Sequence, residues 1–138
     1  YLKASLLKAV EVEEDFYPET FVTEQDYEYL RTSIAAVMGE HDDYLDLCNE
    51  DVRFSDEPMM KSISEDIADV YQSLKDFTEV AKTGNEDLMN DALIVCIEDF
   101  RAFWGTRLLS AELAIHQVLT NGFDDEEEPE INTNPLLI

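Results

Sequence analysis

The chain has 138 residues and a mass of 15.8 kDa, which predicts a single domain. Nine Lys and Arg against 33 Asp and Glu give a formal net charge of −24, which disfavours direct binding to nucleic acid or to an anionic membrane surface. Hydrophobic residues still make up 45% of the chain, which is enough for a core and excludes global disorder. No apolar run approaches the roughly 20 residues that a membrane-spanning helix requires.

The two cysteines, Cys48 and Cys96, lie far apart and belong to no CxxC pair. This pattern argues against a disulfide-stapled secreted scaffold and favours a reducing cytoplasm. Cys96 stands among aliphatic residues and is expected to be a small core hydrophobe. No signal peptide is visible in the given residues, and with the cysteine pattern this gives the expectation of a cytoplasmic protein.

The first third of the chain predicts two helices with an acidic loop between them, at about residues 11–22. The first is short and is marked by Leu2, Leu6, Leu7 and Val10. The second runs from about Glu24 to Met38, because Thr23 and Asp26 form a capping-box pattern and Gly39 can end the helix. Its expected buried face consists of Tyr27, Leu30, Ile34 and Val37. The segment from His41 to Phe54 is ambiguous, and one helical turn around Tyr44, Leu45 and Leu47 is expected there.

The clearest helical pattern runs from about Ser55, a suitable N-cap, to Thr83. Its apolar residues recur at steps of three and four: Met60, Ile63, Ile67, Val70, Leu74, Phe77 and Ala81. Gly84 and Asn85 then predict a tight turn and a new N-cap. The following helix is expected to continue for about 35 residues, to the Asn121-Gly122 pair. Gly105 lies near its middle and predicts a kink or a close approach by another helix.

These two long helices predict an antiparallel hairpin within an all-α, compact bundle of four to five helices. The apolar face of the second helix of the hairpin is Met89, Leu93, Cys96, Phe100, Phe103, Trp104, Leu108, Ala111, Ile115 and Leu119. After Gly122 the composition becomes strongly acidic and cannot form a core. We therefore expect a single domain over residues 1–122 and a flexible acidic C-terminal tail over residues 123–138.

Two blocks of sequence resemble a known family. One block runs from Ser62 to Phe77; the other combines Met89–Leu93 with Phe100, Trp104-Gly105, Arg107-Leu108, Ala111 and His116. Together with Tyr17-Pro18, Phe21–Thr23 and Asp42–Tyr44, they resemble the small acidic bacterial proteins catalogued as domain of unknown function 5063. The resemblance extends to about Leu119. It implies a cytoplasmic α-helical bundle, typical of Bacteroidetes-like bacteria, with no established activity.

Neighbouring carboxylates suggest one enzymatic hypothesis. Glu65 and Asp69 share a helix face, and with Asp66 they faintly resemble the Mg²⁺-binding pairs of all-α nucleoside triphosphate pyrophosphohydrolases. Glu98 and Asp99 are the nearby candidates on a facing helix, and Glu98 is taken as the fourth ligand. A metal-dependent hydrolase using Mg²⁺ or Mn²⁺ is therefore the alternative function, although the chain lacks a cluster of basic residues to hold phosphates; otherwise no cofactor is expected. Glu112 and His116 have the wrong spacing for a di-iron site.

A second group surrounds the single Trp of the chain. Arg101 and Arg107 flank Trp104 on one helix, and His116 lies further along. In the structural interpretation, Arg107 pairs with a carboxylate of the facing helix and Trp104 fills the bundle centre. In the functional one, Arg101, Trp104, Arg107 and His116 form a small pocket for an anion or a partner near Gly105.

No complete catalytic set is present, so the leading hypothesis is a non-enzymatic protein-interaction module. A charge of −24 steers basic proteins toward the molecule and raises their association rates at low salt. An adaptor or inhibitor of a basic partner fits this charge. That partner could be a nucleic-acid-processing enzyme, whose phosphate-binding surface rows of carboxylates would imitate. The plain alternative is that the acidity confers solubility alone.

Overall fold

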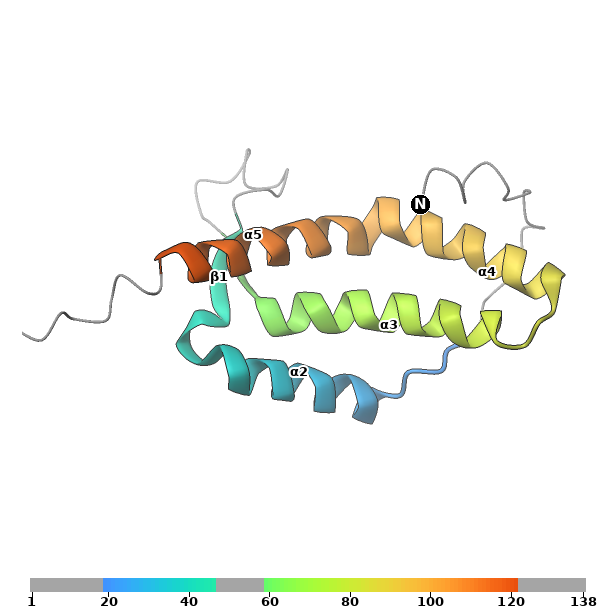
Figure 1. Ribbon diagram of the computed structural model, residues 1–138, viewed down its shortest axis with the longest axis horizontal. Helices are drawn as coiled ribbons and strands as arrows, with labels where there is room; N and C mark the ends of the chain where they lie inside the picture. Colours follow the sequence, from blue (N-terminus) through green and yellow to red (C-terminus); the bar gives the residue numbers. More distant parts are fainter. Residues whose placement is uncertain (1–18, 47–58, 122–138) are drawn as a thin grey trace, which may run out of the picture.

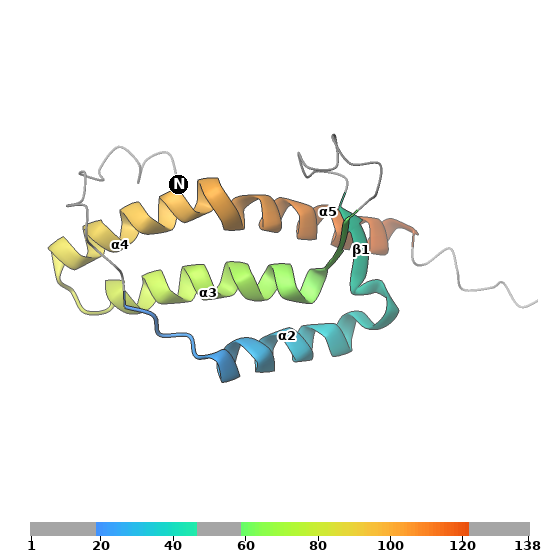
Figure 2. The same cartoon turned by 180° about the vertical axis from the view of Figure 1, so that it is seen from behind.

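A computed structural model describes residues 19–46 and 59–121 of the chain. Its helices are α2 (Glu24–Met38), α3 (Ile63–Ala81), α4 (Glu86–Asp99) and α5 (Gly105–Asn121). They lie in one layer, with α3 between α2 on one side and the α4–α5 rod on the other (Figures 1 and 2). The all-α prediction is confirmed for this part of the chain. The expected helix at residues 2–10 and the acidic tail lie outside the described residues.

Helix α2 begins and ends where its capping residues predicted. The Thr23 hydroxyl accepts a hydrogen bond from the Asp26 amide at 3.1 Å, and the Asp26 carboxylate accepts one from the Thr23 amide at 3.1 Å. Gly39 ends the helix with a φ of +57°, which a glycine adopts without strain. The predicted burial of Val37 is wrong, since its side chain is 85% exposed. Among the described helices, α2 lies at the edge of the layer and packs mainly on α3, so a narrow stripe of it is covered (Figure 1).

A short β-hairpin replaces two expected helical features. Strands β1 (Asp43–Asp46) and β2 (Met59–Ser62) pair antiparallel, with Asp43 opposite Ser62 and Asp46 opposite Met59. The helical turn expected at Tyr44 is therefore wrong, and so is the start of the long helix at Ser55. Exposure alternates along β1, the period-two pattern of a strand with one covered face.

The start of α3 is fixed by Asp42, which directly precedes β1. Its carboxylate accepts hydrogen bonds from the Ser64 amide at 2.8 Å and from the buried Ser64 hydroxyl at 2.7 Å. Its backbone carbonyl accepts another from the Ile63 amide at 2.8 Å. The cap of this helix thus comes from a residue about twenty positions upstream, while the Ser62 side chain makes no capping hydrogen bond.

Replacing Asp42 by alanine should lower the free energy of unfolding by about 2 kcal/mol. The substitution removes a helix cap and leaves the buried Ser64 hydroxyl without its acceptor. Urea unfolding followed by circular dichroism measures the change. Asp43→Ala, at the exposed neighbouring position, is the matched control and should stay within about 0.5 kcal/mol of the parent. Equal losses in the two variants would contradict the capping role.

The α3–α4 hairpin forms as its turn residues predicted. Gly84 has a φ of +72°, and the Asn85 side-chain oxygen accepts hydrogen bonds from the amides of Asp87 and Leu88. The core then lies along the seam between α3 and the α4–α5 rod, where Val70, Cys96 and Trp104 pack with Phe77 and Phe100.

A π-helical turn joins α4 to α5 at the place where a kink was expected. It spans Phe100–Trp104, and the Gly105 amide donates to the Phe100 carbonyl five residues earlier. A Cβ at position 105 would overlap that carbonyl oxygen and lie 2.9 Å from the Phe100 ring. The same ring meets Trp104 edge-on, with the ring centroids 4.7 Å apart. Glycine is therefore required at position 105 by the close approach of residue 100 of the same helix.

The extra residue of the π turn also shifts the buried stripe of the rod. Cys96 and Trp104, both buried, are eight residues apart, whereas two α-helical turns span about seven. Downstream, Ala111 and Ala114 are buried, while Leu108 and Leu119 are largely exposed. The prediction that Leu108 and Leu119 belong to the buried face is therefore wrong, although Trp104 and Ala111 of the same predicted face are buried.

Candidate functional site

A polar network lies at the end of the layer that carries the β-hairpin. Arg107 of α5 reaches α3, where one guanidinium nitrogen lies 3.5 Å from Asp66 Oδ1 and 3.2 Å from Asp69 Oδ2. The guanidinium also lies over the Phe103 ring, 4.2 Å from its centroid. This geometry agrees with the structural interpretation, in which Arg107 pairs with a carboxylate of the facing helix.

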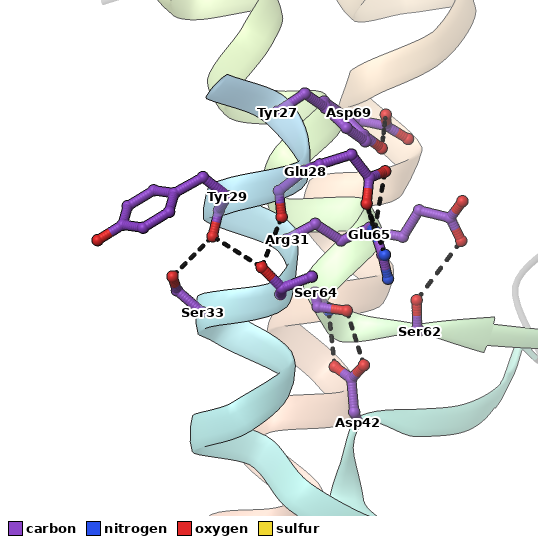
Figure 3. A network of polar contacts seen from close by, with 11 residues as sticks. Tyr27, Glu28, Tyr29, Arg31, Ser33, Asp42, Ser62, Ser64, Glu65 and Asp69 are labelled. Carbon is purple, nitrogen blue, oxygen red and sulfur yellow. Dashed lines mark hydrogen bonds and ion pairs between the residues drawn. The ribbon is translucent and has the colours of Figure 1, made fainter. Parts of the chain in front are cut away.

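Two tyrosines extend the network to β1 and α2. The Tyr44 hydroxyl donates to Asp66 Oδ2. The Tyr27 hydroxyl donates to Asp69 Oδ1 at 2.8 Å (Figure 3). Burial, together with the neighbouring carboxylate, raises the pKa of both phenols above the ordinary range of tyrosine. Both therefore remain protonated donors at neutral pH, and the two carboxylates of α3 connect four separate elements of the fold.

Asp66 is the most deeply buried ionisable side chain of this network, with 1% of the residue exposed. Burial raises the pKa of its carboxyl, while Tyr44, Lys61 and Arg107 act in the opposite direction. Lys61 itself pairs with Asp46 across the hairpin at 2.8 Å. Within residues 19–46 and 59–121, no buried side-chain nitrogen or oxygen lacks a hydrogen-bond partner. Such a network of hydrogen bonds and ion pairs fixes how α2, α3, α5 and the hairpin pack together.

The edge between α2 and α3 carries further polar contacts that are more exposed. Arg31 and Glu28 form an ion pair at 2.7 Å on α2, and Glu65 accepts a hydrogen bond from Ser62 at 3.5 Å (Figure 3). These exposed contacts contribute little to stability. Glu65 also lies close enough to Tyr27 and Arg31 of α2 to interact with them electrostatically.

The carboxylates proposed as metal ligands do not converge. Asp66 and Asp69 contact Arg107, Glu65 is exposed beside Ser62, and Glu98 is exposed on α4. In the described part of the chain, no three His, Cys, Asp or Glu side chains lie together as a metal site requires. The arrangement gives the hydrolase hypothesis no geometric support.

The four residues proposed as an anion or partner pocket are spread along the rod. Arg101 is exposed, and His116 borders a shallow apolar hollow beside Leu109 and Leu113. Trp104 is 3% exposed and its indole N–H donates to the Cys96 carbonyl at 3.2 Å. Among the described residues, no hydrogen bond or ion pair joins Arg101 or His116 to Arg107. An anion-binding role for the four remains a prediction.

The structure reveals a cavity that sequence reasoning missed. It has a volume of about 280 Å³ and lies between α3 and α4, closed at one edge by Glu19 and Thr20. Phe77 and Phe103 form apolar parts of its wall, and Asp99 is among its acidic residues. These residues come from three distant stretches of the chain, so no local pattern could have grouped them. Burial raises the pKa of the Cys96 thiol in the wall, which keeps it neutral and unreactive.

Within the part of the chain that the structure describes, no helix has both the length and the apolar character needed to cross a bilayer. Comparison with curated proteins finds no match. The crystal structure of protein BF1032 from Bacteroides fragilis is similar, with 42% sequence identity and a TM-score of 0.67. The match covers 85% of this chain and 66% of BF1032, so this chain spans slightly less than two thirds of that protein. The model of the DUF5063 family, a domain of unknown function, matches residues 1–121. The chain therefore belongs to the DUF5063 family.

Proposed function

We propose that this protein is a non-enzymatic interaction module that binds a basic region of a partner protein. The observation that carries the proposal is that most of the few Lys and Arg side chains that the structure describes pair with carboxylates of the same chain. In the part of the chain that the structure describes, the Lys and Arg side chains that pair with carboxylates are Arg31, Lys61, Lys75, Lys82 and Arg107. The 33 Asp and Glu of the chain outnumber its nine Lys and Arg by 24, so most carboxylates have no cation of the same chain to pair with.

Among the described helices, α4 has the most uniformly negative set of charged side chains. It begins with Glu86 and Asp87, ends with Glu98 and Asp99, and contains neither Lys nor Arg. A surface of one sign attracts a partner of the opposite sign over a distance set by the Debye length. Helix α4 is therefore the face on which we expect a basic partner to dock first.

The test begins with capture of partners from host lysate, but the deciding measurement uses the purified pair. Binding is measured by surface plasmon resonance at ionic strengths of about 0.01 M and about 0.15 M, over which the Debye length falls from about 30 to about 8 Å. The proposal predicts an association rate at least about tenfold higher at the lower ionic strength. Capture of no protein at low salt, or a rate that does not change with salt, would contradict it.

A matched pair of variants locates the docking face. Asp91→Asn with Glu98→Gln removes two charges from α4, and Glu24→Gln with Glu40→Gln removes two charges from the α2 side. The α4 variant should slow association at low salt about threefold, while the α2 variant should change it by less than half as much. Equal effects of the two variants would show that the association rate depends on the total charge of the protein and not on the α4 face.

A further inference from the structure

We infer that the cavity between α3 and α4 is a socket for one long cationic side chain, a Lys or an Arg, of the partner's basic region. This inference rests on the proposed function and adds the place and the chemistry of the central contact. The cavity lies beside α4, the face to which the charge would bring a basic partner.

The size of the cavity suits a single side chain. Pockets for drug-sized ligands and cofactors run from about 300 to 1,000 Å³. At about 280 Å³ this cavity lies at the lower edge of that range, which favours a small group such as an extended alkyl chain with its head group. Phe77, Val80 and Phe103 in its wall would pack against the methylene stem.

The charge of the wall selects a cation. Glu19, Asp76 and Asp99 are acidic residues of the lining, and among the described residues that line the cavity there is no Lys, Arg or His. One oxygen of Asp76 already accepts hydrogen bonds from the Phe21 and Val22 amides, at 2.7 and 2.9 Å. Among the described residues, neither the Asp99 nor the Glu19 side chain makes a hydrogen bond or an ion pair. These two carboxylates are therefore free to receive an ammonium or guanidinium group.

The electrostatics of Asp99 agree with this role. Burial raises the pKa of its carboxyl, and the neighbouring Glu98 raises it further. The ionised form of a partly desolvated carboxylate without a paired cation is strongly stabilised when a cation binds next to it. Arg107, which lies over the Phe103 ring, does not fill this need because its guanidinium is paired with Asp66 and Asp69.

The socket is tested with short peptides and the full chain. Each peptide carries one central residue between Gly and Ser flanks. Arginine is compared with citrulline, and lysine with norleucine, because each neutral residue keeps the aliphatic stem but lacks the positive charge. Binding is followed by ¹H–¹⁵N NMR titration at about 0.15 M ionic strength, which suppresses long-range attraction. The cationic peptides should shift amides of the cavity wall, such as those of Gln72 and Val80, and the neutral ones should bind at least about tenfold more weakly.

Two isosteric variants on neighbouring positions separate the socket from general acidity. Asp99→Asn should weaken binding of the arginine peptide at least about tenfold, whereas Glu98→Gln, which removes the same charge outside the cavity, should weaken it less than about twofold. Thermal unfolding confirms that both variants remain folded.

Three results would overturn the inference in different ways. Equal losses in the two variants, with binding of the basic partner intact, would reject the socket and leave the interaction module standing. Absence of binding to every basic peptide and to the captured partner would reject both proposals. Binding of agmatine, the free amine with the arginine head group, as tightly as the arginine peptide would assign the cavity to a small molecule instead of a partner protein.

Discussion

Replacing Arg107 by methionine is expected to lower the free energy of unfolding by about 3 kcal/mol at neutral pH. Methionine keeps much of the apolar stem but removes the guanidinium that lies between Asp66 and Asp69. The buried Asp66 carboxylate then keeps the Tyr44 hydroxyl and the more distant charge of Lys61 as its favourable neighbours. Urea unfolding measures the loss, and Arg101→Met, at an exposed position on the same rod, should change stability by less than about 0.5 kcal/mol.

The same variant has a diagnostic pH dependence. Without Arg107, the pKa of Asp66 rises further above its ordinary value of 3.8. A carboxyl whose pKa is raised by folding binds its proton more tightly in the folded state, so its contribution to stability falls as the pH rises through the interval between the two pKa values. The deficit of Arg107→Met relative to the parent should therefore shrink as the pH is lowered from 7 toward about 4. A deficit that stays constant over this range would show that Arg107 acts through packing and not through Asp66.

Gly105→Ala is expected to destabilise the protein by about 3 kcal/mol. The added methyl group would overlap the Phe100 carbonyl oxygen, which accepts the hydrogen bond that closes the π turn, and would press on the Phe100 ring. In an ordinary exposed helix position the same change would instead stabilise by up to about 1 kcal/mol, so the sign alone is informative. Thermal unfolding monitored by circular dichroism measures it, and Thr106→Ala at the next, exposed position is the control.

A second-site change tests the cause of that loss. Phe100→Leu removes the aromatic edge near position 105 but leaves the backbone carbonyl in place. Adding it to Gly105→Ala should therefore recover little stability, because the backbone overlap dominates. Full recovery in the double variant would show that the ring, and not the π turn, demands glycine.

Local signals in the sequence predicted those parts of the fold that local chemistry determines. The Thr23 capping box, Gly39 and the Gly84-Asn85 turn each define a helix end through residues within four positions, and all of them were predicted correctly. The β-hairpin was missed because its four-residue strands are too short for a clear period and pair across the intervening residues 47–58. Asp42 likewise caps a helix that is distant in sequence.

The candidate sites were less accessible to sequence reasoning for a related reason. The pairing of Arg107 with a carboxylate of the facing helix was foreseen, but Tyr27 and Tyr44 join the network only through the packing of α2 and β1 on α3. The sequence offers one indication of this network, which is a tyrosine at a partly buried position next to acidic residues. The cavity depends on side chains that do not meet until α3 and α4 have packed.

The π turn sets the rotational phase of everything that follows it. One residue corresponds to about 100° of rotation around a helix axis, so the extra residue turns α5 by roughly a quarter of a circle relative to α4. Because of that rotation, one continuous rod can line the cavity with Asp99 and still aim Arg107 at Asp66. Insertions and deletions of single residues in the rod are therefore not small perturbations of length. They would rotate the cavity-lining residues of α4 relative to Arg107 of α5. This stretch should therefore tolerate substitutions far better than changes in residue number.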